Sequence, residues 1–516
     1  MRQRVTFLHR PGDAVDPSTL RITDTSLTGP QDARAAREVR TTLALDELPA
    51  ELASVLKTSH ELHVRWVSPD AFDTVAPLHS RLSPGFHLFF TPRQGGDVSE
   101  SEALCRLLRK AFGGLENCVS SEESFVALSP DRFSHSAAFQ FYQPLHNLTH
   151  FARHVGDELC PQGDPLCRAQ AARLTEAVSL DLSYDTISHA LKVTALSPYQ
   201  AQPLLVTGHP GHRTEVGLLG EDALPNVEGH EVGLSGHLVF LGQHKEPSVT
   251  AFGVPSRHRR HHHPDATFSV SIVQPAGLHP TLRLTLSPAA ARPPLPPVGE
   301  GAAASSSCAP HAYLVLPRSV FADRYQLSDP LFLASKNLTA LRHASGPVDL
   351  EAPEYAIGHW GSTALLELAA PPPQSGSQSE WTVQVPLHLR YLAPAARGHR
   401  DVQLPHPVVF WACAAEDGTR FPTNPFDRVN LGYDGLFGPR TVFWHVDPSP
   451  PHSRLFTTID VPVLDLDKAD WVAPGTAAVV LLGFAWVVWK LVAVAVRGRG
   501  ASGVSGPSVA ESKKTK

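Results

Sequence analysis

The sequence lacks the patterns that mark most enzymes and nucleic-acid-binding proteins. It has no G-x-S-x-G elbow, no phosphate-binding glycine loop and no C-x-x-C pair. The net charge is −6 and only 18% of the residues are charged, so no broad positive field is available to hold phosphates. We therefore expect no catalytic residue, no bound metal and no cofactor, and we exclude nucleic acid as a partner.

Long apolar runs are also scarce, because residues 475–496 form the only one. A helix over this run is about 33 Å long, which is enough to cross a hydrocarbon layer of ~30 Å. The sequence predicts a transmembrane helix at 471–496 and a basic tail at 497–516. The alternative is a buried helix in a soluble core, but such helices are rarely apolar on all faces.

The charges around this helix predict its orientation. Lys490, Arg497 and Arg499 lie at its C-terminal side, whereas residues 465–470 are mainly acidic, so we expect a cytosolic tail and a luminal N-terminal part. The start, MRQRVTFLHRPGD, lacks the apolar run of about 7–15 residues that a signal peptide needs. Two explanations stay open: translocation without a cleaved signal, or a tail anchor with the reverse orientation.

Two further patterns favour a luminal environment. Asn147-Leu148-Thr149 and Asn337-Leu338-Thr339 are acceptor sites for N-glycosylation. The chain has six cysteines, an even number that suits an oxidising compartment. They admit fifteen pairings, and proximity in the sequence suggests only two pairs, 105 with 118 and 160 with 167.

Lysine is rare until the C-terminus. Only 10 of the 44 basic residues are lysines, and the chain ends in Lys-Lys-Thr-Lys. This ending is similar to the dilysine retrieval signal of endoplasmic reticulum membrane proteins, which is read on the cytosolic side. Lys513 and Lys514 would form that signal, and a plain solvated basic tail is the alternative.

The abundance of proline favours a mainly β fold. The chain has 47 prolines among 516 residues, and a proline inside a helix costs about 3 kcal/mol. Alternating apolar residues predict strands at 61–67 and 177–184, whereas the spacing at 99–112 and from about 165 to 177 predicts helices. We expect antiparallel sandwich-type luminal domains with few helices and one C-terminal transmembrane helix.

Changes in composition predict the domain boundaries. We expect an N-terminal α+β or β-rich domain at 1–206, a polar linker or insertion at 207–265 and a β-sandwich at 266–470. Within the sandwich, TFSVSIV and TLRLTLSP predict a hairpin, and 288–307 is expected to be a mobile loop. Residues 381–391 form the clearest buried strand, because every odd-numbered position is apolar.

Three clusters resemble chemical sites, and each has a plainer interpretation. The run 258–263, HRRHHH, has imidazoles that suit zinc or copper, but its arginines favour a solvated linker. Asp465-x-Asp467 is similar to the acidic pairs of glycosyltransferases, although its place before the span favours a stalk. Asp349, Glu351 and Glu354 would supply carboxylates for glycoside hydrolysis, but nothing in the sequence places two of them ~5–9 Å apart.

The C-terminal half resembles the PIG-X family and its fungal branch, the protease B non-derepressible proteins. The resemblance rests on these stretches and on the closing single span: LPRSVFADRYQL (316–327), DLEAP (349–353), PLHLRYLAP (386–394), PVVFWAC (407–413) and NPFDRVNLGYDGLFG (424–438). The opening RQRVTFLHRPGD is similar only to the longer fungal form.

This resemblance implies a non-catalytic subunit that stabilises a polytopic partner, the catalytic subunit of glycosylphosphatidylinositol (GPI) mannosyltransferase I. It also implies a single-pass protein of the endoplasmic reticulum membrane with a large luminal part. The resemblance transfers no catalytic residue. Asp349, Glu351 and Arg390 are candidates for partner contact or for a structural motif. Two other hypotheses are a luminal chaperone or quality-control receptor for glycoproteins and, with less support, a membrane-tethered glycoside hydrolase.

Overall fold

The computed structural model describes residues 1–93, 98–128, 137–209, 211–274, 276–294, 308–347, 349–371 and 379–501. Lys513 and Lys514 lie outside the described residues, as does most of the expected loop at 288–307. The chain divides into two compact units. The first consists of Met1–Tyr391 with Asp401–Ile459, and the second of Leu392–Arg400 with the chain from Asp460 onward.

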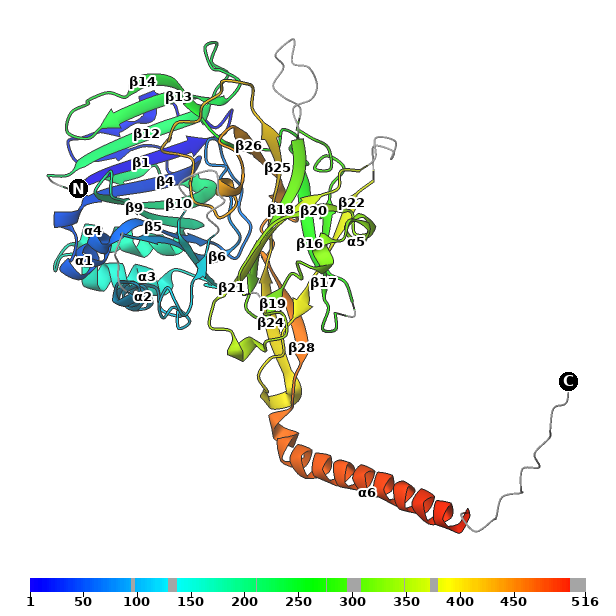
Figure 1. Cartoon of the computed structure of the whole chain (residues 1–516). Helices are drawn as coiled ribbons and strands as arrows, with labels where there is room; N and C mark the ends of the chain where they lie inside the picture. The colour runs from blue at the N-terminus through cyan, green and yellow to red at the C-terminus, as the bar shows by residue number, and fades with distance from the viewer. Residues whose placement is uncertain are drawn as a thin grey trace. The chain divides into compact units, whose positions relative to one another are not determined.

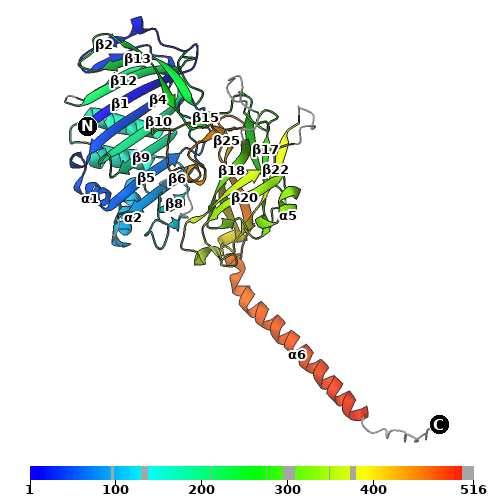
Figure 2. The same cartoon turned by 45° about the horizontal axis from the view of Figure 1, so that its top comes forward.

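The N-terminal half builds an 11-stranded sheet in the order β14-β13-β12-β1-β4-β10-β9-β5-β6-β8-β7, whose strands run side by side in Figures 1 and 2. Neighbouring strands are antiparallel, except that β1 and β12 are parallel. A three-stranded sheet accompanies it, in the order β11-β3-β2. The strands are β1 (Arg2–His9), β2 (Arg21–Ile22), β3 (Ser26–Thr28), β4 (Ala33–Ala44), β5 (Ser59–Val67), β6 (Gly85–Pro92), β7 (Val126–Ala127), β8 (Phe139–Gln143), β9 (Ser179–Asp185), β10 (Ala190–Gln202), β11 (Leu205–Thr207), β12 (Arg213–Glu221), β13 (Glu231–Phe240) and β14 (Ser248–Pro255).

Four helices gather beside this sheet: α1 (Ala50–Thr58), α2 (Val98–Phe112), α3 (Thr149–His154) and α4 (Pro165–Ala172) (Figure 1). The predicted helix at 99–112 is α2, and its side chains at 104, 108 and 112 are buried. Phe112 packs edge-on against Phe86 of β6, with ring centroids 5.0 Å apart. The helix ends at Gly113, whose φ of +63° suits glycine.

The stretch 207–265 is not a linker, because it contains β12, β13, β14 and the short strand β15 (His258–Arg260). Strand β12 pairs with β1 on one side and β13 on the other. Seven consecutive residues of β12, 214–220, are buried. A strand that is buried on both faces shows no alternation of apolar and polar residues, so its periodicity is weak in the sequence.

The C-terminal half has a six-stranded sheet in the order β15-β26-β25-β18-β21-β20 and a four-stranded sheet in the order β22-β17-β16-β27. β19 pairs with β23 and β24 with β28, and β15–β26 and β16–β27 are parallel pairs. The remaining elements are β16 (Thr267–Ile272), β17 (Thr281–Leu286), β18 (Cys308–Pro317), β19 (Val320–Phe321), α5 (Pro330–Ser335), β20 (Leu338–Ser345), β21 (Gly361–Leu368), β22 (Trp381–Pro386), β23 (His388–Leu389), β24 (His399–Pro405), β25 (Val408–Ala414), β26 (Thr441–His445), β27 (Asp447–Pro448) and β28 (Phe456–Pro462).

The mainly β fold with few helices is confirmed, and the predicted hairpin is the antiparallel pair β16–β17. The long strand expected at 381–391 is interrupted. Val383, Val385 and Leu387 are buried, but Tyr391 is 68% exposed. β22 ends at Pro386, which has no N–H to donate, and β23 then pairs with β19 instead of β17.

One hydrophobic core contains residues of both halves of the first unit. It includes Phe86 and Phe141 of the large sheet together with Tyr313, Phe410 and Tyr433 of the C-terminal half. Burial of apolar surface stabilises by about 25 cal/mol per Å². The two halves therefore share a stabilising core, and the division at 1–206 and 266–470 stays a prediction.

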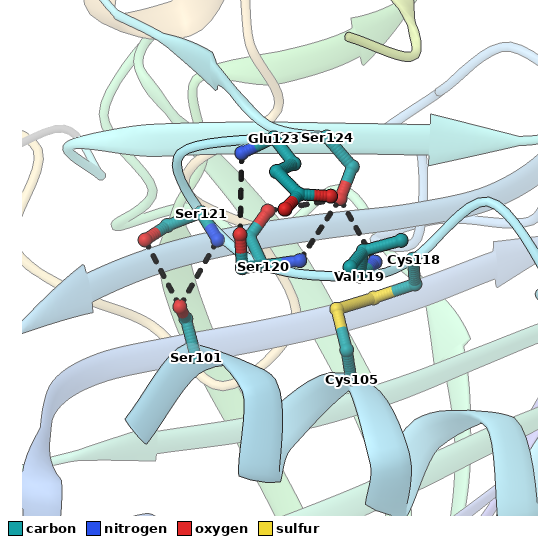
Figure 3. Close-up of a disulfide and its surroundings, with 8 residues drawn as sticks. All are labelled: Ser101, Cys105, Cys118, Val119, Ser120, Ser121, Glu123 and Ser124. Carbon is teal, nitrogen blue, oxygen red and sulfur yellow. Dashed lines mark hydrogen bonds between the residues drawn. A yellow bond between two sulfur atoms is a disulfide. The ribbon is translucent and has the colours of Figure 1, made fainter. Parts of the chain in front are cut away.

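Three disulfides join Cys105 to Cys118, Cys160 to Cys167 and Cys308 to Cys413. The first connects α2 to the loop 118–124, where serine side chains hold the backbone (Figure 3). Ser124 Oγ accepts from the backbone N–H groups of Val119 and Ser120. The carbonyl of Ser124 then accepts from the N–H of Trp360, so this braced loop contacts the C-terminal half.

The second unit contains α6 (Ala469–Ala501) and the turns that precede it. Asp465 Oδ1 accepts from the N–H of Asp467 at 3.0 Å, and Lys468 Nζ lies 3.1 Å from Asp465 Oδ2. The acidic pair therefore caps a turn next to the helix. This arrangement agrees with the stalk interpretation.

Candidate functional site

Arg390 lies where three of the segments that resemble the PIG-X family meet. Its Nη1 donates to the carbonyl of Ala352 at 2.9 Å, and its backbone N–H donates to the carbonyl of Ser319 at 2.9 Å. The residue is only 4% exposed. One arginine thus joins the segments 316–327, 349–353 and 386–394.

An aromatic ring supports this arginine. The Arg390 Cζ lies 4.5 Å from the centroid of Phe321, whose ring stacks on His388 at 5.2 Å. A guanidinium over an aromatic face gains about 0.5–2 kcal/mol. Burial lowers the pKa of Arg390, and the nearby charge of Asp349 opposes that shift.

Asp349 shapes the loop that Arg390 holds. Its Oδ1 accepts from the backbone N–H groups of Glu351 at 2.9 Å and Ala352 at 3.0 Å, which is a turn held by an aspartate side chain. The neighbouring carboxylate of Glu354 pairs with Arg318 Nε at 2.6 Å. Both carboxylates therefore hold the fold together, and this arrangement does not favour an acid/base pair for hydrolysis.

Glu351 differs from its neighbours because its side chain is exposed and forms no ion pair within 4 Å among the described residues. Tyr355 and Tyr391 are exposed beside it, by 66% and 68%. The N–H of Glu354 donates to the carbonyl of Tyr391 at 2.9 Å, which brings the two tyrosines to one area. We call Glu351, Tyr355 and Tyr391 the tyrosine surface. Exposed tyrosines are typical of protein interfaces.

The segment 424–438 forms a second site, which sequence reasoning missed. Arg428 Nη2 lies 2.9 Å from Glu38 Oε2 and its Nε lies 2.8 Å from Asp181 Oδ2. Arg65 Nη1 lies 3.4 Å from the other oxygen of Asp181. Glu38 and Asp181 belong to β4 and β9 of the large sheet, so Arg428 connects the C-terminal half to two of its strands. Arg65 of β5 adds a third strand, because its guanidinium donates to the carbonyl of Val429.

The charges in this cluster, which we call the Arg428 network, stabilise one another. Burial disfavours the charged form of Arg428, but Asp181 and Glu38 outweigh it and raise the pKa of Arg428 above its usual range. Burial also acts to raise the pKa of Asp181, yet Arg428 and Arg65 hold it below the usual value. Arg428 and Asp181 are therefore both charged at neutral pH.

Hydrogen bonds extend the same connection. Asn430 Nδ2 donates to Glu61 Oε1 of β5 at 2.8 Å, and the hydroxyl of Tyr433 donates to the carbonyl of Arg81 at 2.8 Å. Asp434 accepts from the backbone N–H of Asn430 and so fixes the turn between them. The match of 424–438 to a family segment was the available signal. Nothing local in the sequence indicates the partners on the N-terminal sheet.

The two predicted glycosylation sites differ in accessibility. Asn147 is exposed, and its Oδ1 accepts from the N–H of Thr149 at 3.0 Å. Asn337 is half-buried with φ +58°, and its Nδ2, the atom that would carry the glycan, donates to the carbonyl of Thr382 at 2.8 Å. Asn147 is the more accessible acceptor.

The histidine run 258–263 is not a solvated linker. His258 and His261 are buried, and His258 Nδ1 lies 3.0 Å from His445 Nε2. Burial lowers the pKa of both His258 and His445 well below the usual value, so both are neutral. Among the described residues, no group of three or more His, Cys, Asp or Glu side chains is placed to hold a metal ion.

The predicted transmembrane helix lies within α6. The segment Leu466–Arg497 is long and apolar enough to cross a membrane, and none of its most apolar window is buried. Leu482 and Phe484, for example, are 72% and 66% exposed. A core helix would bury such side chains, so the alternative of a buried soluble helix is not supported.

Fold and sites together define a β-rich protein with one C-terminal helix able to span a membrane. Comparison with known proteins shows its relatives. The profile of the PIG-X / PBN1 family matches residues 275–492. Protein pbn1 of Neurospora crassa is 54% identical over 496 residues, which cover 96% of this chain and 95% of that protein. Protein PBN1 of Gibberella zeae is 44% identical, with 98% of each chain covered, and Protein PBN1 of Saccharomyces cerevisiae is 29% identical over 45% of this chain and 47% of its own.

The chain belongs to the PIG-X / PBN1 family. The expected resemblance is therefore confirmed, and it extends over nearly the whole length, including the N-terminal half. Membership connects the protein with the biosynthesis of GPI anchors. Arg390, Asp349 and the segment 424–438 all lie within the matched range.

Proposed function

We propose that the protein is a non-catalytic, stabilising subunit of GPI mannosyltransferase I in the endoplasmic reticulum. In this role it is required for adding the first mannose to the GPI-anchor precursor. The single observation that carries the proposal is that the side chains of Arg390 and Asp349 bind backbone groups of neighbouring segments. Arg390 and Asp349 hold backbone segments together, so they support a folded surface rather than a reaction.

The membrane helix agrees with such a role. A lipid-linked sugar reacts near the bilayer surface, and one helix alone cannot enclose a site there. The partner in this proposal is therefore the polytopic catalytic subunit. The tyrosine surface, with the exposed carboxylate of Glu351, is the proposed contact for its luminal loops.

We place the large N-terminal part in the lumen and the tail with Lys513 and Lys514 in the cytosol. Three disulfides support this topology, because such bonds persist in oxidising compartments and are rare in the cytosol. The exposed acceptor at Asn147 supports it further. Protease treatment of sealed microsomes tests the topology: the first unit stays intact if it is luminal, and its digestion contradicts the proposal.

Depletion of the protein tests the function itself. We expect the abundance of the catalytic subunit and the transfer of mannose from dolichyl-phosphate mannose in microsomes to fall together. Unchanged abundance and activity would contradict the proposal. Purification in mild detergent adds a second readout, since a subunit yields one stoichiometric partner whereas a chaperone yields a broad set of clients.

A further inference from the structure

The first unit contains a cavity of about 610 Å³ that lies away from Arg390 and the tyrosine surface. Binding sites for small ligands are typically about 300–1,000 Å³. A single bound water occupies only about 30 Å³, so this space is far larger than one or two bridging waters need. The walls come from the ends of β1, β12 and β13, from the loop 74–79, and from β15 with Trp444 of β26.

One wall of the cavity contains the side chain of Arg259. This side chain is half-buried, and its Nε donates weakly to the carbonyl of Ser256 at 3.4 Å. The other arginines in the lining are paired, Arg10 with Asp73 and Arg260 with Asp447. Arg259 lines the cavity and forms no ion pair within 4 Å among the described residues, so its charge is left for a ligand.

Carboxylates line the same cavity at a distance from this arginine. Burial lowers the pKa of Arg259, and the charges of Asp427, Glu221 and Glu231 oppose that shift, yet none of these carboxylates lies within 4 Å of it as an ion pair. A hydroxyl group matches both kinds of side chain, because it can accept from a guanidinium and donate to a carboxylate at the same time. A phosphate would satisfy Arg259 but would also face four carboxylates in the lining, at 221, 222, 228 and 231.

The remaining walls suit the same ligand chemistry. The rings of Trp444 and His262 lie 4.3 Å apart and add an aromatic surface for an apolar ring face. His79 lines the cavity too, and burial lowers its pKa to about 3, so its imidazole is neutral. A neutral imidazole offers one donor and one acceptor, as a hydroxyl does.

We propose that this cavity binds an uncharged, hydroxyl-rich sugar of a glycan, with Arg259 and the carboxylates of Glu221 and Glu231 sharing its hydroxyls and Trp444 facing its ring. This inference goes beyond the proposed subunit role. The protein would then contact a glycan directly in addition to bracing its partner.

Calorimetry and saturation-transfer NMR on the full chain test the proposal. The protein is held in a polyoxyethylene detergent, because alkyl maltosides carry a competing sugar. The probes are α-1,2-mannobiose, N,N′-diacetylchitobiose and inorganic phosphate. We expect saturable binding of a disaccharide, and the preferred one distinguishes mannose from the N-acetylglucosamine core of a glycan. Absence of saturable sugar binding, or tighter binding of phosphate than of either sugar, overturns the proposal.

Variants locate the binding. Arg259→Ala and the volume-conserving Glu221→Gln should each weaken sugar binding at least ~10-fold, which corresponds to about 1.4 kcal/mol. Glu221 is exposed, so Glu221→Gln should fold and can test the cavity even if Arg259→Ala does not fold. Arg440→Ala is the matched control, because Arg440 pairs with the exposed Asp417 and does not line the cavity. Binding by both cavity variants as tight as that of the control would overturn the proposal.

Discussion

Arg428 Nη2 lies 2.9 Å from Glu38 Oε2, although the two residues are 390 positions apart in the chain. Glu38 is 1% exposed in β4, a strand inside the large N-terminal sheet, and Arg428 belongs to the C-terminal segment 424–438. The pair therefore makes the N-terminal sheet and the family segment depend on each other. This dependence agrees with the comparison, because Protein pbn1 of Neurospora crassa matches both halves of the chain.

Replacing Arg428 by alanine should destabilise the first unit strongly. Among the described residues, the change leaves the buried Glu38 and Asp181 with only the longer contacts to Arg40 at 3.3 Å and Arg65 at 3.4 Å. Breaking a buried ion pair by removing one partner costs about 3–5 kcal/mol. Thermal or denaturant unfolding of the purified protein measures the loss. Arg440→Ala removes an arginine from an exposed pair and should cost no more than about 1 kcal/mol. Equal unfolding temperatures for the two variants would contradict the role of the Arg428 network.

The three disulfides should differ in their contributions. They close loops with sequence separations of 105, 13 and 7 residues. Loop-closure entropy predicts losses of about 5, 3 and 2 kcal/mol, respectively, when each pair is replaced by alanine. Unfolding of the three double variants measures the order. The ranking would be contradicted if the variant without the 160–167 disulfide lost the most stability. Thiol labelling of the wild-type protein, unfolded without a reducing agent, should detect no free cysteine.

Much of the fold follows from local patterns, whereas the sites depend on distant contacts. The alternation at 61–67 predicted β5, because the polar His63 and Arg65 alternate with apolar residues although both faces of the strand are buried. The helical spacing at 99–112 predicted α2, which buries its apolar face. Strand β12 was missed because it is buried on both faces. Arg390 was named as a candidate from its segment, but its contact with Ala352 required the loop geometry. Arg428 was not named, since no short-range pattern reports a partner as distant as Glu38.

The acceptor Asn147 should carry a glycan more fully than Asn337. Asn147 is exposed, whereas Asn337 uses its Nδ2 to hold the carbonyl of Thr382. Thr149→Ala and Thr339→Ala each remove one acceptor site and leave the asparagine in place. With endoglycosidase treatment as the readout, the first variant should lose most of the mobility shift. A shift that persists in Thr149→Ala and vanishes in Thr339→Ala would contradict this order.

Variants at Arg390 and Glu351 should have different effects, the first on the stability of the fold and the second on contact with the partner. Arg390→Ala removes a charged hydrogen bond to Ala352 and the contact with Phe321, which together predict a loss of about 2 kcal/mol in unfolding free energy. Glu351→Ala alters an exposed side chain and should leave the unfolding temperature within about 1 °C of the wild type. If the tyrosine surface binds the partner, Glu351→Ala and Tyr355→Ala should lower the co-purified catalytic subunit several-fold. If both variants fold and co-purify as much catalytic subunit as the wild type, the tyrosine surface is not the contact with the partner.

His87 should make the stability depend on pH in the acidic range. It is fully buried in β6, and its Nε2 donates to the carbonyl of Ser83 at 2.7 Å. Among the described residues, its Nδ1 has no partner that could accept a second proton. Burial lowers its pKa from 6.5 to about 4. Below pH 6.5 the unfolded chain therefore binds a proton that the folded chain excludes. The contribution of His87 to stability is fully present above pH 6.5. As the pH decreases below 6.5, this contribution decreases by about 1.4 kcal/mol per pH unit, until the pH reaches the folded pKa near 4.

The variant His87→Phe isolates this contribution from those of the other histidines. At pH 7 it should be less stable than the wild type, because it loses the hydrogen bond to Ser83. As the pH falls from 6.5 to 4, the wild type loses the stability that depends on a neutral His87, and the variant does not. The two curves of unfolding free energy against pH should therefore converge. Curves that stay parallel over this range would mean that His87 titrates alike in the folded and unfolded chains, contrary to its burial.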